Sequence, residues 1–369
     1  MTGNDAIRQS GGPVWVTWLG VVAIFLGVLF AAHEGTELMR QVVLENATPV
    51  DLELPAAACP EDELEEEGLS IAECEQMVEN IRSYVVSMPT WFTNAQAWLS
   101  WVGTLLAIGS LVCGVALANF RFWAAKIGAV VFTWLTVVDA GHFIVVQQAG
   151  PILRAIHLPV TVLWFSIHFT LAIVFHLASR QQPEQVPVDA GPVPYERFEV
   201  VVHWFLAVAV FFLFVSSWWM LSLPLPSEDF RYRELPFQLH KNIGIMIAVL
   251  MIAMAVIRVR RHQALAVIAD ETAWMRKLRI CGHVSLYVLI FAVCFTGYMS
   301  SSYSGWSTTW WWFIDLPNWS QENDALNQLY SDLHLWTCWA LLIAMATHIG
   351  AALTHALRND GIVYRILRW

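Results

Sequence analysis

Long apolar segments alternate with shorter polar ones along most of the chain. Eight of the apolar segments are long enough to cross the hydrocarbon core of a bilayer as helices, which takes about 20 residues each. The pattern therefore predicts an all-α integral membrane protein with eight transmembrane helices. The expected spans are residues 14–32, 94–118, 124–146, 158–178, 198–222, 241–258, 281–300 and 334–356.

Two polar segments organise these spans into domains. Residues 34–93 are expected to form an acidic outer loop, and the Pro-, Gln- and Gly-rich stretch 181–194 reads as a cytoplasmic linker. The linker separates an N-terminal four-helix membrane domain, residues 1–180, from a C-terminal four-helix bundle, residues 195–369. A third polar segment, Ser300 to Asp332, is rich in tryptophan, which is typical of an aromatic belt at the membrane interface or of a lid over an outer site.

Composition excludes several classes of protein. The chain is 57% hydrophobic and only 14% charged, which is incompatible with a soluble protein, and its net charge of −10 argues against nucleic-acid binding. Its six cysteines form no CxxC motif, so c-type haem attachment and thiolate metal sites are not expected. Cys59 and Cys74 lie in the acidic loop, where they either form a disulfide, if that loop faces an oxidising compartment, or stay free.

The distribution of Lys and Arg predicts the orientation. With the N-terminus in the cytoplasm, most of the 20 Lys and Arg residues fall in inner loops, as the positive-inside rule requires. The expected topology therefore has both termini in the cytoplasm and the loop with Cys59 and Cys74 outside. The cations left in outer segments are Arg40, Arg82, Arg154, Arg231, Arg233 and Lys241.

Four histidines of the C-terminal half form two pairs at matching depths. His334 and His348 are 14 residues apart in the last span, or about 21 Å along a helix. His240 lies near the outer side with His334, and His203 lies near the inner side with His348. Two imidazoles at one depth can fill both axial positions of a haem iron, which suits electron transfer because no coordination site stays open.

These histidines stand in motifs that resemble the bacterial di-haem cytochrome b561 family over about residues 195–369. The resemblance implies a four-helix bundle with two haem b groups, whose axial ligands are His203, His240, His334 and His348. The motifs are Tyr195-Glu-Arg-Phe-x4-His203-Trp, His240-Lys-x-Ile-Gly, Gly282-His283-x3-Tyr, Thr296-Gly297-Tyr298, His348-x-Gly-Ala-Ala-Leu-x-His355 and Arg358-Asn-Asp-Gly-Ile-Val-Tyr-Arg.

The same resemblance implies a place in the bacterial inner membrane, among lipid, and electron traffic between the quinone pool and a donor or acceptor at either surface. The chain is then a quinone-linked oxidoreductase, as in members that resemble superoxide-fed quinone reductases, or an electron-transfer subunit with a periplasmic partner. One alternative is a haem-containing anchor that helps to assemble a larger redox complex. Another is a transporter that uses the region of Asp139 and His142.

Further polar residues in the spans have no assigned role. His283 and His355 could contact a haem propionate, help to protonate a quinone, or replace one of the four ligands. In the N-terminal half, one set of residues shares a depth and could bind a metal, form a proton path, or simply contact headgroups or the outer loop. His168 is different, because it lies near mid-span; with His176 eight residues further on it could serve a third haem or a quinone, or it could form a hydrogen bond to a neighbouring helix. The set that shares a depth is His33, Glu34, Asp139, His142 and His157.

Overall fold

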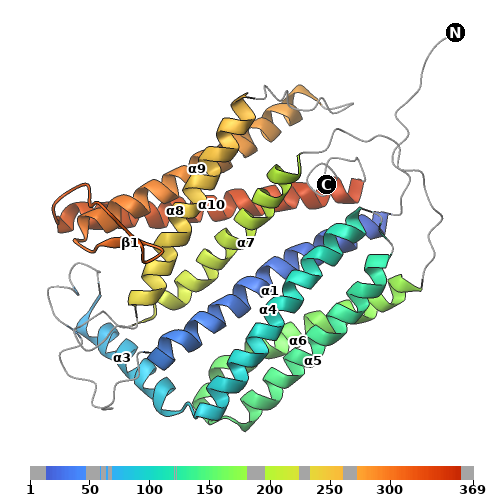
Figure 1. The fold of residues 1–369 in the computed structure, drawn as a ribbon, viewed down its shortest axis with the longest axis horizontal. Coiled ribbons are helices and arrows are strands. Elements are labelled where there is room, and N and C mark those ends of the chain that lie inside the picture. Colours follow the sequence, from blue (N-terminus) through green and yellow to red (C-terminus); the bar gives the residue numbers. More distant parts are fainter. Residues whose placement is uncertain are drawn as a thin grey trace. The chain divides into compact units, whose positions relative to one another are not determined.

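The computed structural model describes residues 14–46, 59, 64, 69–119, 121, 123–180, 196–223, 233–260 and 272–358. Within these residues the chain is almost entirely helical (Figure 1). The described helices are α1 (Val14–Asn46), α3 (Ile71–Val86), α4 (Thr90–Ala118), α5 (Trp123–Gln148), α6 (Pro151–Ser179), α7 (Arg197–Met220), α8 (Glu234–Arg260), α9 (Ala273–Tyr303) and α10 (Asp324–Arg358).

Eight of these helices are long and apolar enough to cross a membrane, and α3 is not one of them. This result confirms the expected all-α integral membrane protein. Most of the described helices extend past the predicted spans, as in α10, which begins ten residues before His334. Helix α7 is the exception at its C-terminal end, because it stops at Met220 and the predicted span ran to residue 222. The reason is that hydropathy locates only the apolar centre of a helix, whereas polar residues of good helix propensity continue the helix at its ends.

The predicted outer loop at 34–93 is wrong in its boundaries. Helix α1 continues through His33 and Glu34 and runs to Asn46, so these two residues lie inside a helix. Within the remaining polar stretch, α3 forms a further helix from Ile71 to Val86. Ser70 caps α3, because its backbone N–H and its hydroxyl donate to the Glu73 carboxylate at 2.9 and 2.7 Å.

Cys59 and Cys74 form a disulfide next to the start of α3. Cys74 is almost fully buried and packs with Leu64. A disulfide is compatible with the expected location outside the cytoplasm. The orientation of the termini stays a prediction. The expected linker at 181–194 lies wholly outside the described residues. The motif at 358–365 lies outside them except for its first residue.

Contacts between residues divide the chain into two units. The first unit holds residues 1–48, 82–216 and 352–369, and the second holds residues 49–81 and 217–351. Helix α7, expected in the C-terminal bundle, thus groups mainly with the N-terminal helices. The predicted domain boundary at the linker stays a prediction, since the linker lies outside the described residues.

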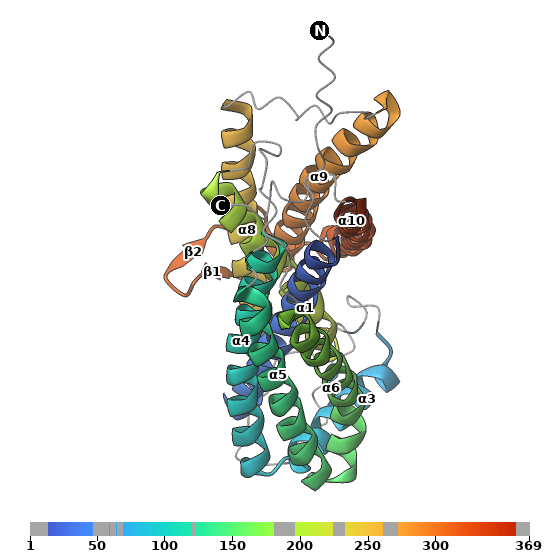
Figure 2. The same ribbon diagram turned by 90° about the vertical axis from the view of Figure 1, so that its right-hand side faces the viewer.

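The first unit contains a bundle of α1, α4, α5 and α6, which lie side by side (Figures 1 and 2). Helix α1 packs on α4 at a close crossing of Gly20 and Gly114, where a Cβ on Gly20 would lie 2.7 Å from the Gly114 carbonyl oxygen. Small residues of this kind let membrane helices approach closely. The core between the helices is apolar and aromatic, with Phe30, Phe132 and Phe175 almost fully buried.

The second unit contains α8, α9, most of α10 and a two-stranded antiparallel hairpin, β1 (Thr308–Trp310) with β2 (Ile314–Leu316). The register pairs Thr308 with Leu316 and Trp310 with Ile314. The hairpin occupies part of the tryptophan-rich segment that was expected to be an aromatic belt or a lid.

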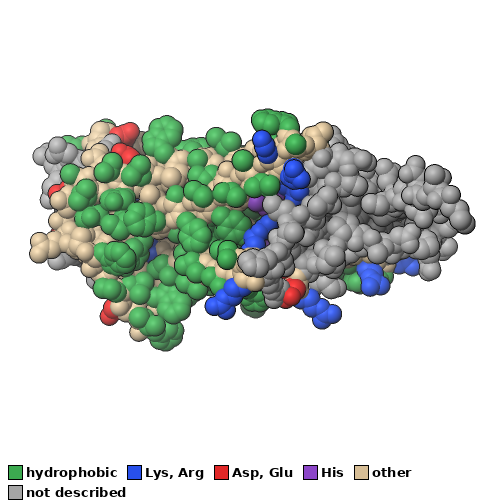
Figure 3. Space-filling model, turned by 90° about the horizontal axis from the view of Figure 1, so that it is seen from above, with side chains coloured by type: hydrophobic (Ala, Val, Ile, Leu, Met, Phe, Trp, Pro, Cys, Tyr) green, Lys and Arg blue, Asp and Glu red, His purple; other side chains and the backbone are tan. Residues whose placement is uncertain are grey.

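Apolar side chains cover much of the outer surface of the described helices. Figure 3 shows hydrophobic side chains over a large part of one face, with Lys and Arg side chains gathered in one region of it. Large apolar side chains such as Trp218, Val259 and Ile343 are mostly exposed. Such a surface suits contact with lipid tails, in agreement with the eight candidate spans.

Candidate functional site

The outer histidine pair lies inside the second unit. His240 on α8 and His334 on α10 have ring centres 6.2 Å apart. The Nδ1 atom of His334 donates to the backbone carbonyl of Val293 at 2.9 Å, and the Nδ1 atom of His240 lies 3.1 Å from the Ser217 hydroxyl. Each Nδ1 atom therefore has a protein partner, so Nε2 is the nitrogen that would face a metal ion. At His334 this Nε2 atom lies 3.7 Å from the Cys338 thiol, a contact that a metal ion would replace.

Gly297 on α9 makes room for the His334 ring. A Cβ on Gly297 would lie 2.9 Å from Cε1 and 3.0 Å from Nδ1 of His334. Thr296, the residue before it, places its hydroxyl 3.4 Å from the same Nδ1 atom. The Thr296-Gly297 motif thus has a physical role, because it positions the imidazole of His334 against α9.

The β1–β2 hairpin is fastened to α8 directly after His240. The Lys241 ammonium donates to the carbonyl of Ser307 at 3.0 Å, and the buried Asn242 amide oxygen accepts from the backbone N–H of Trp311 at 2.9 Å. Trp311 and Trp312 both have positive φ angles, 48° and 60°, which are strained for bulky side chains. The Asn242 hydrogen bond stabilises this turn next to the outer histidine pair.

Two further histidines of the second unit lie close together nearer the other end of α10. The ring of His348 is 5.4 Å from that of His283 on α9. The Nδ1 atom of His283 donates to the carbonyl of Arg279 at 2.8 Å, within its own helix. His203 on α7 belongs to the first unit, so the pairing of His203 with His348 stays a prediction. His355 follows seven residues after His348 on α10 and is half-buried.

Glycines beside these histidines fit a flat prosthetic group. A Cβ on Gly244, one turn after His240, would meet no atom within 4 Å, and the same holds for Gly350, two residues after His348. Imidazoles with a fixed Nδ1 atom, next to open and apolar helix faces, are the donor set and surroundings that a haem requires. The residues of the second unit therefore fit the haem that the sequence motifs imply.

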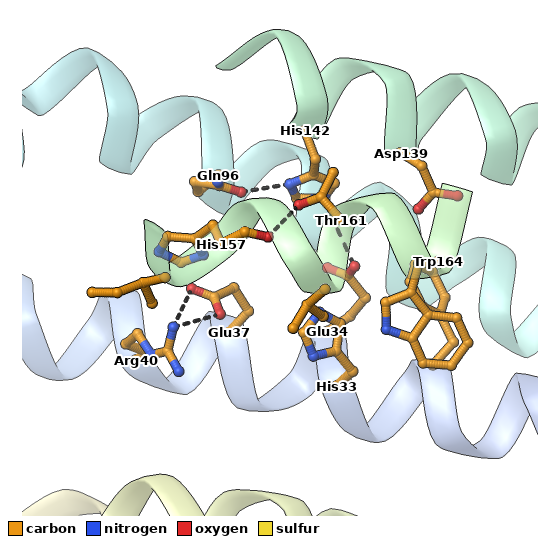
Figure 4. A pocket seen from close by; sticks show the side chains of 13 residues that line it. His33, Glu34, Glu37, Arg40, Gln96, Asp139, His142, His157, Thr161 and Trp164 are labelled. Carbon is orange, nitrogen blue, oxygen red and sulfur yellow. Dashed lines mark hydrogen bonds and ion pairs between the residues drawn. The ribbon is translucent and has the colours of Figure 1, made fainter. Parts of the chain in front are cut away.

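A second candidate site lies in the first unit, away from these histidines in sequence. Polar side chains from four helices line a cavity of about 100 Å³ (Figure 4). Five of the six residues singled out in the N-terminal half line it, so they share a depth as expected. The polar lining consists of His33, Glu34, Glu37 and Arg40 from α1, Gln96 from α4, Asp139 and His142 from α5, and His157, Thr161 and Trp164 from α6.

Glu34 and His142 form the centre of this pocket. Their exposed fractions are 2% and 8%, and Glu34 Oε1 lies 3.7 Å from His142 Nε2. His142 Nδ1 bonds to the Gln96 amide oxygen, so that nitrogen carries the proton of the neutral ring and Nε2 is an acceptor. Among the described residues, Glu34 Oε2 and His142 Nε2 have no hydrogen-bond partner.

An ion pair and a tyrosine lie at the end of the pocket near Arg40 and His157. Arg40 and Glu37 are 3.0 Å apart on one face of α1. Tyr84 of α3 places its hydroxyl 2.8 Å from His157 Nε2. Burial, together with the nearby Glu37 carboxylate, raises the pKa of the Tyr84 phenol above its ordinary value. The phenol therefore stays protonated and donates its hydrogen bond to His157.

His168, the sixth residue, does not line the cavity but is connected to it. Its Nδ1 atom donates to Asp139 Oδ2 at 2.7 Å, and both side chains are almost fully buried. The His168 ring stacks on Trp164 at 5.4 Å and meets Phe30 edge to face at 4.5 Å. Its hydrogen bond joins α5 to α6, as one of the sequence alternatives expected.

Sequence reasoning missed half of this pocket. Glu37 and Arg40 were assigned to a loop. Glu34, Glu37 and Arg40 nevertheless follow one another at intervals of three residues, which places them on one face of a helix. Gln96 and Trp164 carried no signal of their own, and Tyr84 approaches from a helix that was not expected. In the described part of the chain, no group of three or more His, Cys, Asp or Glu side chains has the arrangement of a metal site.

Comparison with known proteins concerns the C-terminal half. The family model of prokaryotic cytochrome b561 matches residues 194–369. Cytochrome b561 homolog 2 of Escherichia coli (strain K12) is 27% identical over 177 residues, which cover 48% of this chain and 92% of that relative. No solved structure matches the chain. The C-terminal half therefore matches the prokaryotic cytochrome b561 family, as its histidine motifs predicted, and this match supports a membrane b-type cytochrome in electron transfer.

Proposed function

We propose that the chain is a cytochrome b of the bacterial inner membrane that exchanges electrons between the quinone pool and a donor or acceptor at a membrane surface. Two b haems, each held by two histidines, carry the electrons. The eight candidate spans and the family match support a multi-pass protein of this membrane. The observation that carries the proposal is the His240–His334 pair, whose Nδ1 atoms are engaged by Ser217 and Val293.

In this proposal the protein holds and orients the haems. His240 and His334 bind one iron, and His203 and His348 bind the other. A haem held there by two imidazoles would supply a one-electron centre. Gly297 and the carbonyl of Val293 set the angle of the His334 ring. These partners also raise the basicity of the ligand nitrogen, which tunes the potential of the iron.

Exchange with a quinone also requires protons, because reduction of one quinone to quinol takes up two electrons and two protons. His283 and His355 are the residues proposed to deliver or accept these protons at the inner side. His283 already lies 5.4 Å, ring centre to ring centre, from the proposed ligand His348. The alternative roles are a contact with a haem propionate or replacement of a ligand.

The decisive experiment is a reduced-minus-oxidised absorbance spectrum of the purified full chain, together with its haem-to-protein ratio. The expected result is a b-type spectrum with about two haems per chain. A protein without haem contradicts the proposal and favours the transporter alternative. More than two haems per chain would place a further haem in the N-terminal half.

A second assay separates the proposed oxidoreductase from the anchor alternative. The purified chain is mixed with a soluble quinol, and haem reduction is followed at its absorbance bands. Reduction by quinol alone supports quinone exchange by the chain itself. Haems that respond to dithionite but not to quinol indicate a relay subunit that needs other proteins of a larger complex.

A further inference from the structure

We propose that the polar pocket of the N-terminal half is a proton-transfer site, in which Glu34 and His142 share one exchangeable proton. Tyr84 and His157 connect this pair to the polar side of the bundle at α3. This inference does not depend on the haems, because none of its residues is a proposed haem ligand.

Burial without a full set of partners is the first argument. Glu34 Oε2 and His142 Nε2 are both inaccessible and make no hydrogen bond among the described residues, although both atoms are strong acceptors. A buried polar atom without a partner costs about 1–3 kcal/mol, so such atoms need an explanation. A proton on His142 Nε2 removes the cost at that atom, because Nε2 then donates toward the nearby Glu34 carboxylate. The 3.7 Å between Glu34 Oε1 and His142 Nε2 is a distance that one water molecule can bridge.

The volume of the cavity indicates which kind of molecule it can hold. Its volume of about 100 Å³ is below the roughly 150 Å³ of an engineered cavity that holds benzene, so the space favours small polar species over a quinone ring or a haem. The same volume holds about three water molecules, and the polar lining offers each of them partners. The four-helix arrangement in Figure 4 places these side chains around one space. Water and a proton are therefore the species that this site accommodates.

The charged and titratable groups facing the pair come from all the packed helices. Helix α1 contributes His33, Glu37 and Arg40, and α4 contributes the neutral side chains Gln96 and Ser100. Helix α5 contributes Asp139, whose carboxylate accepts from His168, and α6 contributes His157. Arg40 and Glu37 compensate each other as an ion pair. Glu34 and His142 thus have no other charged group as a fixed partner. We therefore assign the gain and loss of a proton to this pair.

The step itself is a proton transfer with no redox change. A proton enters from water near α3, passes through the Tyr84 hydroxyl and the His157 ring, and binds at His142 Nε2 or Glu34 Oε2. The O–H bond of Tyr84 breaks as its proton moves to His157 Nε2, and a proton from water then restores the phenol. The Nδ1 proton of the His157 ring then leaves toward the cavity. Proton relays built from His, Glu and Asp are a recurring use of ionisable residues in membrane helices.

Infrared difference spectroscopy of the purified full chain tests this inference. Between about pH 5 and about pH 9 the wild-type protein should gain and lose a carbonyl band of a protonated carboxyl group. Glu34→Gln should remove this band, whereas the matched control Glu73→Gln, at an exposed carboxylate of α3, should leave it unchanged. A wild-type protein without such a band, or a band that persists in Glu34→Gln, overturns the proposal.

A kinetic variant keeps the test decisive if Glu34→Gln fails to fold. Tyr84→Phe removes only the hydroxyl, so the carboxyl band should keep its amplitude while its deuterium exchange slows by about tenfold or more. An unchanged exchange rate overturns the relay through Tyr84. Because the infrared readout does not use haem, a chain with two haems but no Glu34 band contradicts this inference alone, and a haem-free chain with the band contradicts only the proposed function.

Discussion

The His334 imidazole is positioned by α9 through two kinds of contact. The carbonyl of Val293 accepts from Nδ1, and the absence of a Cβ on Gly297 lets the ring approach the helix. His142 is positioned in a similar way by Gln96, which bonds its Nδ1 atom. In both cases the partner fixes the tautomer, and thereby decides that Nε2 is the atom that acts.

Alanine variants of the proposed ligands should remove haems selectively. We expect His334→Ala to lose the outer haem and keep the inner one, and His348→Ala to do the reverse, so that each retains about half of the haem absorbance. The haem-to-protein ratio and the difference spectrum measure this. His176→Ala is the control, because this exposed histidine on α6 contacts Arg180 instead. Loss of neither haem in either ligand variant contradicts the assignment.

The partner of His348 can be decided by a matched pair of variants. If His203 is the ligand, His203→Ala removes the inner haem, while His283→Ala leaves it bound with a shifted midpoint potential. The opposite result would assign the iron to His283, whose ring neighbours His348. Spectra at low temperature, which resolve the two haems, are the measurement.

Gly297→Ala should disturb the outer haem with little effect on the rest of the fold. The new methyl group would lie 2.9 Å from the His334 ring, and overpacking of this kind typically costs about 1–3 kcal/mol. We expect a shifted midpoint potential or partial loss of the outer haem in a redox titration. Gly150→Ala, where a Cβ meets nothing within 4 Å, should behave like the wild type. Equal effects of both substitutions would refute the steric argument.

At the scale of elements, the length of α1 explains most of what sequence reasoning missed. The hydropathy pattern located all eight spans because lipid contact requires long apolar segments. It ended the first span at Ala32, because charged residues follow, but the buried face of α1 continues with Glu34, Glu37 and Gln41. A helix face can be polar where it packs against polar residues of neighbouring helices. A sequence without its fold does not show those neighbours.

The outer histidine pair, in contrast, could be predicted almost completely. His240 and His334 were placed at one depth from their positions in the spans, and their rings are neighbours within one unit. Depth in a membrane follows directly from residue number along a helix, at about 1.5 Å per residue. Depth alone does not show which rings face each other across the bundle. His283 and His203 therefore both remain candidates for the second ligand beside His348.

The cap of α3 predicts a pH dependence. Hydrogen bonds from the backbone N–H and the hydroxyl of Ser70 hold the pKa of Glu73 below its ordinary value. The ionised Glu73 carboxylate therefore stabilises the helix at any pH above its pKa in the unfolded chain, about 4.3. This stabilisation is lost as the pH falls through the lower pKa that Glu73 has in the folded protein. Protection of residues 71–86 in hydrogen exchange, corrected for intrinsic rates, should therefore drop in acid.

Glu73→Ala should lower the protection of α3 at neutral pH and abolish its acid-dependent part. Glu75→Ala removes a neighbouring charge without touching the cap, and should retain the wild-type pH profile. If both variants keep the acid-dependent loss, the Ser70–Glu73 cap is not its origin.

At the scale of the whole molecule, the topology can be tested through its cysteines. We expect both termini in the cytoplasm and Cys59 and Cys74 outside, because most Lys and Arg residues then lie inside. In intact cells, a membrane-impermeant thiol reagent should label Cys59 and Cys74 after mild reduction. Ala264→Cys, in the predicted inner segment after α8, should be labelled only in broken cells. The reverse pattern would invert the topology.

The length of α1 has an electrical consequence for the pocket. Its 33 residues span about 50 Å, whereas the hydrocarbon core is about 30 Å thick, and His33 lies about 28 Å from Val14 along the axis. A proton that reaches Glu34 from the α3 side has therefore crossed little of the membrane potential. His168 contacts Phe30, four residues before Glu34 on α1, so the Asp139–His168 pair lies only about 6 Å further along the helix axis than Glu34. The full thickness acts with about 2.3 kcal/mol per charge at 100 mV, so this step crosses about a fifth of the field. Protonation of Glu34 should thus hardly respond to voltage, and the Asp139–His168 pair should respond only slightly more.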